Sequence, residues 1–89
     1  MHSHHGHPNI IKRLKRAEGH LKSVIRMIEE EKPCVDLAQQ LHAVESAIGN
    51  AKRELIHNHI EHCLDEGHAK TAAKMRIQMN ELKQLSKYL

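Results

Sequence analysis

The chain has 89 residues, the size of one small domain, and its 14 Lys and Arg against 11 Asp and Glu give a formal net charge of +3. It has no Phe, no Trp and one Tyr. Such a chain builds its core from aliphatic side chains, typically on helices that share their apolar faces between subunits, so we expect an obligate oligomer. The sequence has no Gly-rich phosphate loop and no acid-base constellation, which argues against an enzyme.

The N-terminal segment, residues 1–8 (MHSHHGHP), is polar and rich in His, and we expect a flexible tail. The rest, residues 9–89, reads as a single helical domain. Asn9 is a plausible N-cap for a first helix that continues to the break at Lys32-Pro33. Its apolar residues recur at helical spacing: Ile10, Leu14, Ala17, Leu21, Val24, Ile25 and Ile28.

The opposite side of this helix is basic. From Lys12 to Arg26 the chain has six basic residues and one acid, Glu18. A local excess of this kind suggests a surface for a polyanion, although an ordinary solvated helix face has the same composition. The side chains on this face are Lys12, Lys15, Arg16, Lys22 and Arg26.

A second helical pattern starts at Cys34 and keeps its phase for about 30 residues. Gly49-Asn50 is a possible turn, but the unchanged spacing on both sides favours one unbroken helix that ends near a C-cap at Gly67. A third, weaker helix is predicted over residues 69–88. The predicted class is therefore all-α with three helices. The buried candidates of the third helix are Ala72, Ala73, Ile77, Leu82 and Leu85.

The segment IHNHIEHCLDEGH, residues 56–68, gathers four His and one Cys. On a helix, His59 and Cys63 are one turn apart and can chelate one metal ion. The other thiol, Cys34, is 25 residues before His59, or about 37 Å along an unbroken helix. Within one chain these groups cannot meet.

Two such helices packed antiparallel would bring Cys34 of one subunit to His59 and Cys63 of the other. The crossing would fall at Ala47, Ile48 and Gly49, two of which are small. A twofold dimer would then carry two equivalent intersubunit metal sites.

Each of these residues also has a structural interpretation. Either cysteine can serve as a small buried hydrophobe, and an isolated His on a helix is usually solvated or hydrogen-bonded. The chain has no apolar run near 18 residues and no signal peptide, so we expect a cytoplasmic protein with free thiols and no membrane contact.

Three features together resemble the bacterial CsoR/RcnR family of metal-sensing repressors: KRLKRAEGHLKSVIRMIEEEKPC, DLAQQLHAVESAIGNAKREL, and Cys34 followed by His59 and Cys63. The resemblance covers roughly residues 10–66. It implies antiparallel dimers that pair into a disc-shaped homotetramer without a helix-turn-helix. It also implies that the metal-free protein binds operator DNA and that metal releases it to derepress an efflux gene.

Carried over by position, the resemblance implies residues for both activities. The metal ligands would be Cys34, His59 and Cys63, with His2 at the position of the N-terminal His that nickel- or cobalt-sensing members add. For DNA it implies Arg13 and Arg16, with Lys12, Lys15 and Arg53 as neighbours.

The metal is predicted from ligand chemistry and from two positions at which this chain departs from the copper-sensing members of the family. Two thiolates and one imidazole suit Cu(I), whereas adding His2 gives an N2S2 set that suits Ni(II) or Zn(II). Copper-sensing members have a Tyr before the Cys, where this chain has Pro33, and a Glu in the third helix that aligns near Met79 and Glu81. The His content and these departures favour the nickel- or cobalt-responsive branch, with Ni(II) or Co(II) as effector and Cu(I) as the alternative.

Two further functions use the same residues. A metal storage protein would keep the ligands and ignore DNA, which leaves the basic face unexplained. A thiol sensor of electrophiles or persulfides would rely on Cys34 alone.

Overall fold

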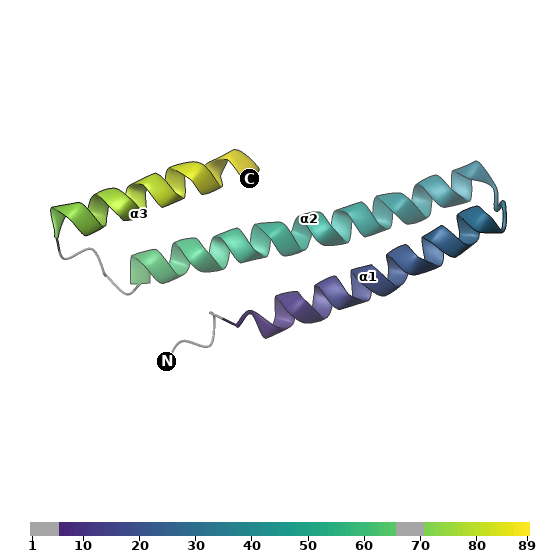
Figure 1. Cartoon of the computed structure of the whole chain (residues 1–89), viewed down its shortest axis with the longest axis horizontal. Helices are drawn as coiled ribbons and strands as arrows, with labels where there is room; N and C mark the ends of the chain where they lie inside the picture. Colours follow the sequence, from purple (N-terminus) through teal and green to yellow (C-terminus); the bar gives the residue numbers. More distant parts are fainter. Residues whose placement is uncertain (1–5, 66–70) are drawn as a thin grey trace.

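The computed structural model describes residues 6–65 and 71–89, with the side chains of 63–65 left out. It consists of α1 (Pro8–Glu29), α2 (Cys34–Asp65), α3 (Ala72–Leu85) and a short 3-10 helix, η2 (Ser86–Tyr88). No strand occurs in the described ranges. The predicted all-α, three-helix class is confirmed. In Figure 1, α2 lies in the middle, with α1 running antiparallel to it on one side and α3 on the other.

The first helix begins earlier than the sequence indicated. Asn9 is not the N-cap: the helix starts at Pro8, and His7 occupies the cap position with a left-handed φ of 45° and no capping hydrogen bond from its side chain. Proline is favoured at the first helical position because its φ is already suitable and the amide it lacks would have no partner there. The preference of Pro8 therefore overrides the capping preference of Asn9.

The turn between α1 and α2 is a Schellman motif. The amide of Glu31 donates to Ile28 O at 3.0 Å, and the amide of Lys32 donates to Met27 O at 3.1 Å. Glu31 adopts the left-handed conformation, with φ 59°, that this motif requires. The chain then passes Pro33 and enters α2 at Cys34, as predicted.

The second helix is continuous over 32 residues. Gly49 and Asn50 lie inside it, so the prediction of an unbroken helix is confirmed. The predicted cap at Gly67 lies outside the described residues.

Aliphatic side chains fill the seam between α1 and α2. Those from α1 follow one another at intervals of seven residues, so they form one stripe. Val24 is fully buried. The buried residues are Ile10, Ala17 and Val24 on α1, and Val44, Ala51 and Ile56 on α2.

Much of the predicted apolar face remains open in the protomer. The molecule measures 59 × 26 × 14 Å, and its shortest dimension is little more than the roughly 10–12 Å diameter of one helix. The helices therefore lie in a single layer (Figure 1), whereas a stable domain needs a second layer over its apolar faces. The large apolar side chains left between 39% and 49% exposed are Ile11, Leu14, Leu21, Ile25 and Ile28 on α1 and Leu41, Ile48 and Leu55 on α2.

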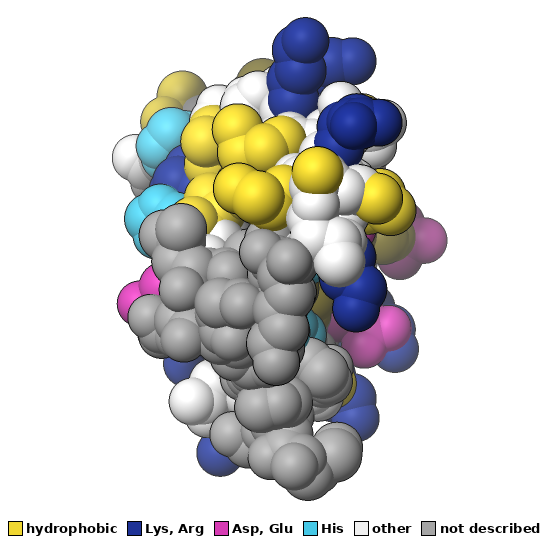
Figure 2. All heavy atoms as spheres, turned by 90° about the vertical axis from the view of Figure 1, so that its left-hand side faces the viewer, with side chains coloured by type: hydrophobic (Ala, Val, Ile, Leu, Met, Phe, Trp, Pro, Cys, Tyr) yellow, Lys and Arg dark blue, Asp and Glu magenta, His cyan; other side chains and the backbone are white. Residues whose placement is uncertain are grey.

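The third helix is capped by Thr71, whose Oγ1 accepts a hydrogen bond from the amide of Lys74 at 3.1 Å. The prediction that Ala72, Ala73 and Ile77 are buried is wrong for the protomer: no residue of α3 is buried, and only Leu82 and Leu85 among the candidates are half-buried. Figure 2 shows hydrophobic side chains gathered on the surface of α3. None of the described helices has the length and apolarity needed to cross a membrane.

Candidate functional site

His59 connects α2 to α3. Its Nε2 lies 2.7 Å from Oε1 of Glu81, and the two side chains are 37% and 51% exposed. An ionised carboxylate only accepts hydrogen bonds, so Nε2 is the donor in this contact, and in the neutral imidazole this tautomer leaves the Nδ1 lone pair available. A carboxylate that accepts a hydrogen bond from an imidazole in this way is typical of metal-binding histidines, because it fixes the orientation of the ring. Of the two residues that the sequence left open, Met79 and Glu81, the structure brings Glu81 to the histidine.

The two ends of α2 are far apart. Cys34 is exposed at the first residue of the helix, about 37 Å from the level of His59 at the helical rise. Among residues 6–62 and 71–89, whose side chains are described, no three His, Cys, Asp or Glu are grouped to hold a metal ion. Cys63 belongs to α2 but its side chain is not described, and His2 lies outside the described residues.

A cavity of about 400 Å³ adjoins His59. His7, just before α1, also lines it, and the Nδ1 atom of His7 is buried without a hydrogen-bond partner among the described residues. Two imidazoles therefore line one space, fewer than the three or more donors that a metal site needs. Sequence reasoning treated His7 only as one of several tail histidines and did not place it beside His59, because the packing of α1 on α2 brings the two to one cavity. The lining residues are His7, Leu55, Ile56, His59, Glu81, Gln84, Leu85 and Tyr88.

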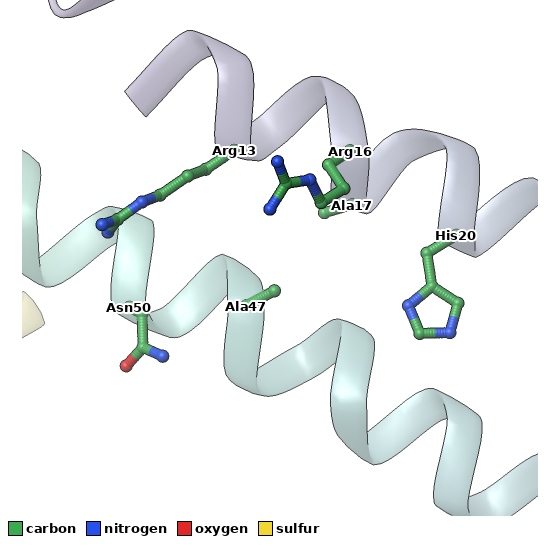
Figure 3. A pocket seen from close by; sticks show the side chains of 6 residues that line it. All are labelled: Arg13, Arg16, Ala17, His20, Ala47 and Asn50. Carbon is green, nitrogen blue, oxygen red and sulfur yellow. The ribbon is translucent and has the colours of Figure 1, made fainter. Parts of the chain in front are cut away.

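A second cavity, of about 380 Å³, lies between α1 and α2 and is called the basic groove here. Figure 3 shows Arg13, Arg16 and His20 extending from α1 toward α2. His20 Nε2 lies 2.6 Å from the Gln40 side-chain oxygen, which ties this part of α1 to α2. The lining residues are Arg13, Arg16, Ala17, His20, Ala47 and Asn50.

The predicted DNA-binding residues have different surroundings. Lys12, Lys15 and Arg16 are exposed on α1. Arg13 instead reaches across to α2, where its Nη1 lies 2.8 Å from Oε2 of Glu54. The remaining residue of this set, Arg53, donates a hydrogen bond to the side-chain oxygen of Asn50.

These features define an all-helical protein with a carboxylate-bound histidine toward one end of α2 and a basic groove along α1. Comparison with known proteins specifies the family. The family model described as metal-sensitive transcriptional repressor matches residues 6–89, and the chain belongs to this family.

Several curated relatives are named copper-sensing transcriptional repressors. The CsoR protein of Mycobacterium ulcerans is 49% identical over 53 residues, which cover 60% of this chain and 45% of the relative. CsoR of Mycobacterium tuberculosis is 39% identical over 71 residues, covering 75% and 60%, respectively. CsoR of Bacillus subtilis is 38% identical over 55 residues, covering 62% and 54%. The chain thus spans about half the length of the curated relatives it matches. No solved structure shows significant similarity to it.

Proposed function

We propose that this protein is a transcriptional repressor that holds operator DNA in its metal-free form and releases it when a metal ion binds between two subunits. The observation that carries the proposal is the His59–Glu81 pair at 2.7 Å, because a neutral imidazole that donates from Nε2 presents its Nδ1 lone pair to a metal ion. Membership of the metal-sensitive repressor family supports both activities.

The metal site would combine Cys34 of one subunit with His59 and Cys63 of a second. Support comes from the exposed stripe of Leu41, Ile48 and Leu55, whose members are seven residues apart and symmetric about Ile48. In an antiparallel pair of α2 helices centred on Ile48, Leu41 meets Leu55 and the two copies of Ile48 meet each other. In the same register, Cys34 faces position 62, between the two ligand positions of the other chain. Burying this stripe supplies the second layer that the protomer lacks. Pairing of such dimers would give the homotetramer.

We propose Cu(I) as the effector metal. Two thiolates and one imidazole make a soft three-ligand set of the kind that Cu(I) accepts. The relatives named above as copper-sensing support this choice, and Glu81 supplies the orienting carboxylate. A metal at Nδ1 draws electron density from the ring and makes Nε2–H a stronger donor to Glu81, so binding should tighten the contact between α2 and α3.

Ni(II) or Co(II) is the second candidate. It is favoured by the His-rich tail, in which His2 would complete an N2S2 set, and by Pro33 at the position where copper-sensing members have Tyr.

The test is an optical titration of the reduced, metal-free protein with Cu(I), Ni(II) and Co(II). Cys34→Ala should lose tight metal binding and stay on DNA after metal is added. A tail deletion that removes residues 1–7 separates the metals: Cu(I) affinity should be unchanged, whereas a nickel site that uses His2 would lose affinity and coordination symmetry. If the deletion weakens Ni(II) binding and abolishes metal-driven release, Ni(II) replaces Cu(I) as the effector.

A mobility-shift assay with a GC-rich palindromic promoter fragment tests the DNA half of the proposal. Because Lys and Arg contacts to phosphates displace counterions, binding should weaken steeply with salt. A protein that binds metal tightly and ignores all such fragments is a storage protein. One that leaves DNA on alkylation of Cys34 but not on metal addition is a thiol sensor.

A further inference from the structure

We propose that the basic groove between α1 and α2 seats a backbone phosphate of the operator DNA and that Glu54 competes with this phosphate for Arg13. The inference rests on the proposed function and adds to it the place where α1 meets DNA and a residue that limits affinity.

The groove has the chemistry of a phosphodiester site. Arg13 and Arg16 extend from α1 into the space that faces α2 (Figure 3), and both line the same cavity of about 380 Å³. A guanidinium presents several N–H donors in a planar fork, which binds phosphate oxygens in a bidentate manner. Small side chains, Ala17 and Ala47, line the groove between the two helices and leave room for an anion.

Arg13 already has an internal anion. Its Nη1 lies 2.8 Å from Oε2 of Glu54, which comes from α2. The side chains are 53% and 34% exposed, so water and a DNA phosphate can both reach this pair. A solvated ion pair of this kind is weakly held, and a strongly charged polyanion can replace the carboxylate.

The two states of Arg13 have opposite consequences for DNA. Paired with Glu54, Arg13 contributes no net charge to the groove, and the nearby carboxylate repels phosphates. Released from Glu54, it adds one phosphate contact and one displaced counterion. Glu54 therefore lowers the affinity of the metal-free protein for DNA, which leaves a repressor that metal can dislodge.

The experiment compares Glu54→Gln with Glu30→Gln in the full chain, reduced and metal-free, by fluorescence anisotropy with an operator fragment at several salt concentrations. Glu30 is a matched control because it is also exposed and paired, with Lys32 Nζ at 3.9 Å, and loses the same charge on substitution. We expect Glu54→Gln to tighten DNA binding by about twofold to fivefold more than the control, the range that a solvated ion pair is worth. The salt slope should steepen by about one.

Arg13→Ala closes a double-mutant cycle. If Glu54 acts through Arg13, adding Glu54→Gln to Arg13→Ala should have no more effect than adding Glu30→Gln. An equal effect of the two Gln variants, weaker DNA binding by Glu54→Gln, or a gain that persists without Arg13 would each overturn the inference while the repressor function stands. If the wild-type chain and all variants fail to bind any promoter fragment, the proposed function itself is wrong. Thermal unfolding of each variant checks that the fold is kept.

Discussion

The α1–α2 pair and α3 are attached to the molecule in different ways. Every buried aliphatic side chain of the described residues belongs to α1 or α2, and α3 contributes none. What holds α3 to α2 is the half-buried Leu82 and Leu85 together with the hydrogen bond between His59 and Glu81. The pair is fixed by packing, whereas the position of α3 depends on a polar contact made by a candidate metal ligand. A metal bound at His59, as proposed, would therefore act on the part of the fold that is least constrained by apolar burial.

The largest expected effect comes from comparing a new carboxylate in the seam between α1 and α2 with one on the surface of α3. Val24 is fully buried between α1 and α2, so Val24→Asp buries an unpaired carboxylate and should cost about 3–5 kcal/mol of unfolding free energy. Met75 on α3 is 53% exposed, and Met75→Asp should change stability by less than about 0.5 kcal/mol. Urea unfolding followed by circular dichroism measures both. A large loss for Met75→Asp would show that α3 is buried against another subunit.

The contact between α2 and α3 can be weakened by a substitution that leaves no cavity behind. Glu81→Gln keeps the shape of the side chain but removes the charge that orients His59, so metal affinity should fall about 10- to 100-fold. Amide hydrogen exchange in α3 should also become faster. Glu45→Gln is the matched control, because Glu45 also faces a histidine, with 3.9 Å to Nδ1 of His42, far from the metal donors. Equal metal affinities in the two variants would remove Glu81 from the site.

The smallest expected effect comes from alanine substitutions at two glycines, one in α1 and one in α2. A Cβ at Gly19 meets no atom within 4 Å, and one at Gly49 meets only the Arg53 guanidinium, with Nη1 at 3.6 Å and Nη2 at 3.9 Å. Both glycines lie inside helices, so alanine at either position should stabilise the protomer by about 0.5–1 kcal/mol. Gly49 is also at the proposed crossing of two α2 helices, where the added methyl would separate the chains.

Thermal unfolding at two protein concentrations, with light scattering for mass, checks this pair of variants. Gly19→Ala should unfold at a higher temperature with the same oligomeric mass. Gly49→Ala should gain less, and its melting temperature should depend more strongly on concentration. Identical behaviour of the two variants would place the crossing elsewhere on α2.

Most of the secondary structure could be predicted from the sequence, because the apolar side chains of an amphipathic helix recur every three or four residues. The phase of apolar side chains from Cys34 onward was enough to predict that α2 continues through Gly49-Asn50. The same pattern could not separate the protomer core from a subunit interface. Val24 and Leu21 are both aliphatic and belong to one predicted apolar face, yet Val24 is buried and Leu21 is 39% exposed. The two residues differ in exposure because α2, the one helix packed on α1, covers only part of the apolar face of α1.

Contacts between helices required the tertiary structure. Glu81 pairs with His59 across 22 positions of the chain, and Arg13 pairs with Glu54 across 41. Periodicity places each residue on a face of its own helix, but it gives neither the rotation of that helix nor its shift along a neighbour. Packing of Ile10, Ala17 and Val24 against α2 sets both quantities for α1. The sequence therefore determined the helices and the candidate ligands, whereas the packing of α1 and α3 on α2 decided which carboxylate orients His59 and which one neutralises Arg13.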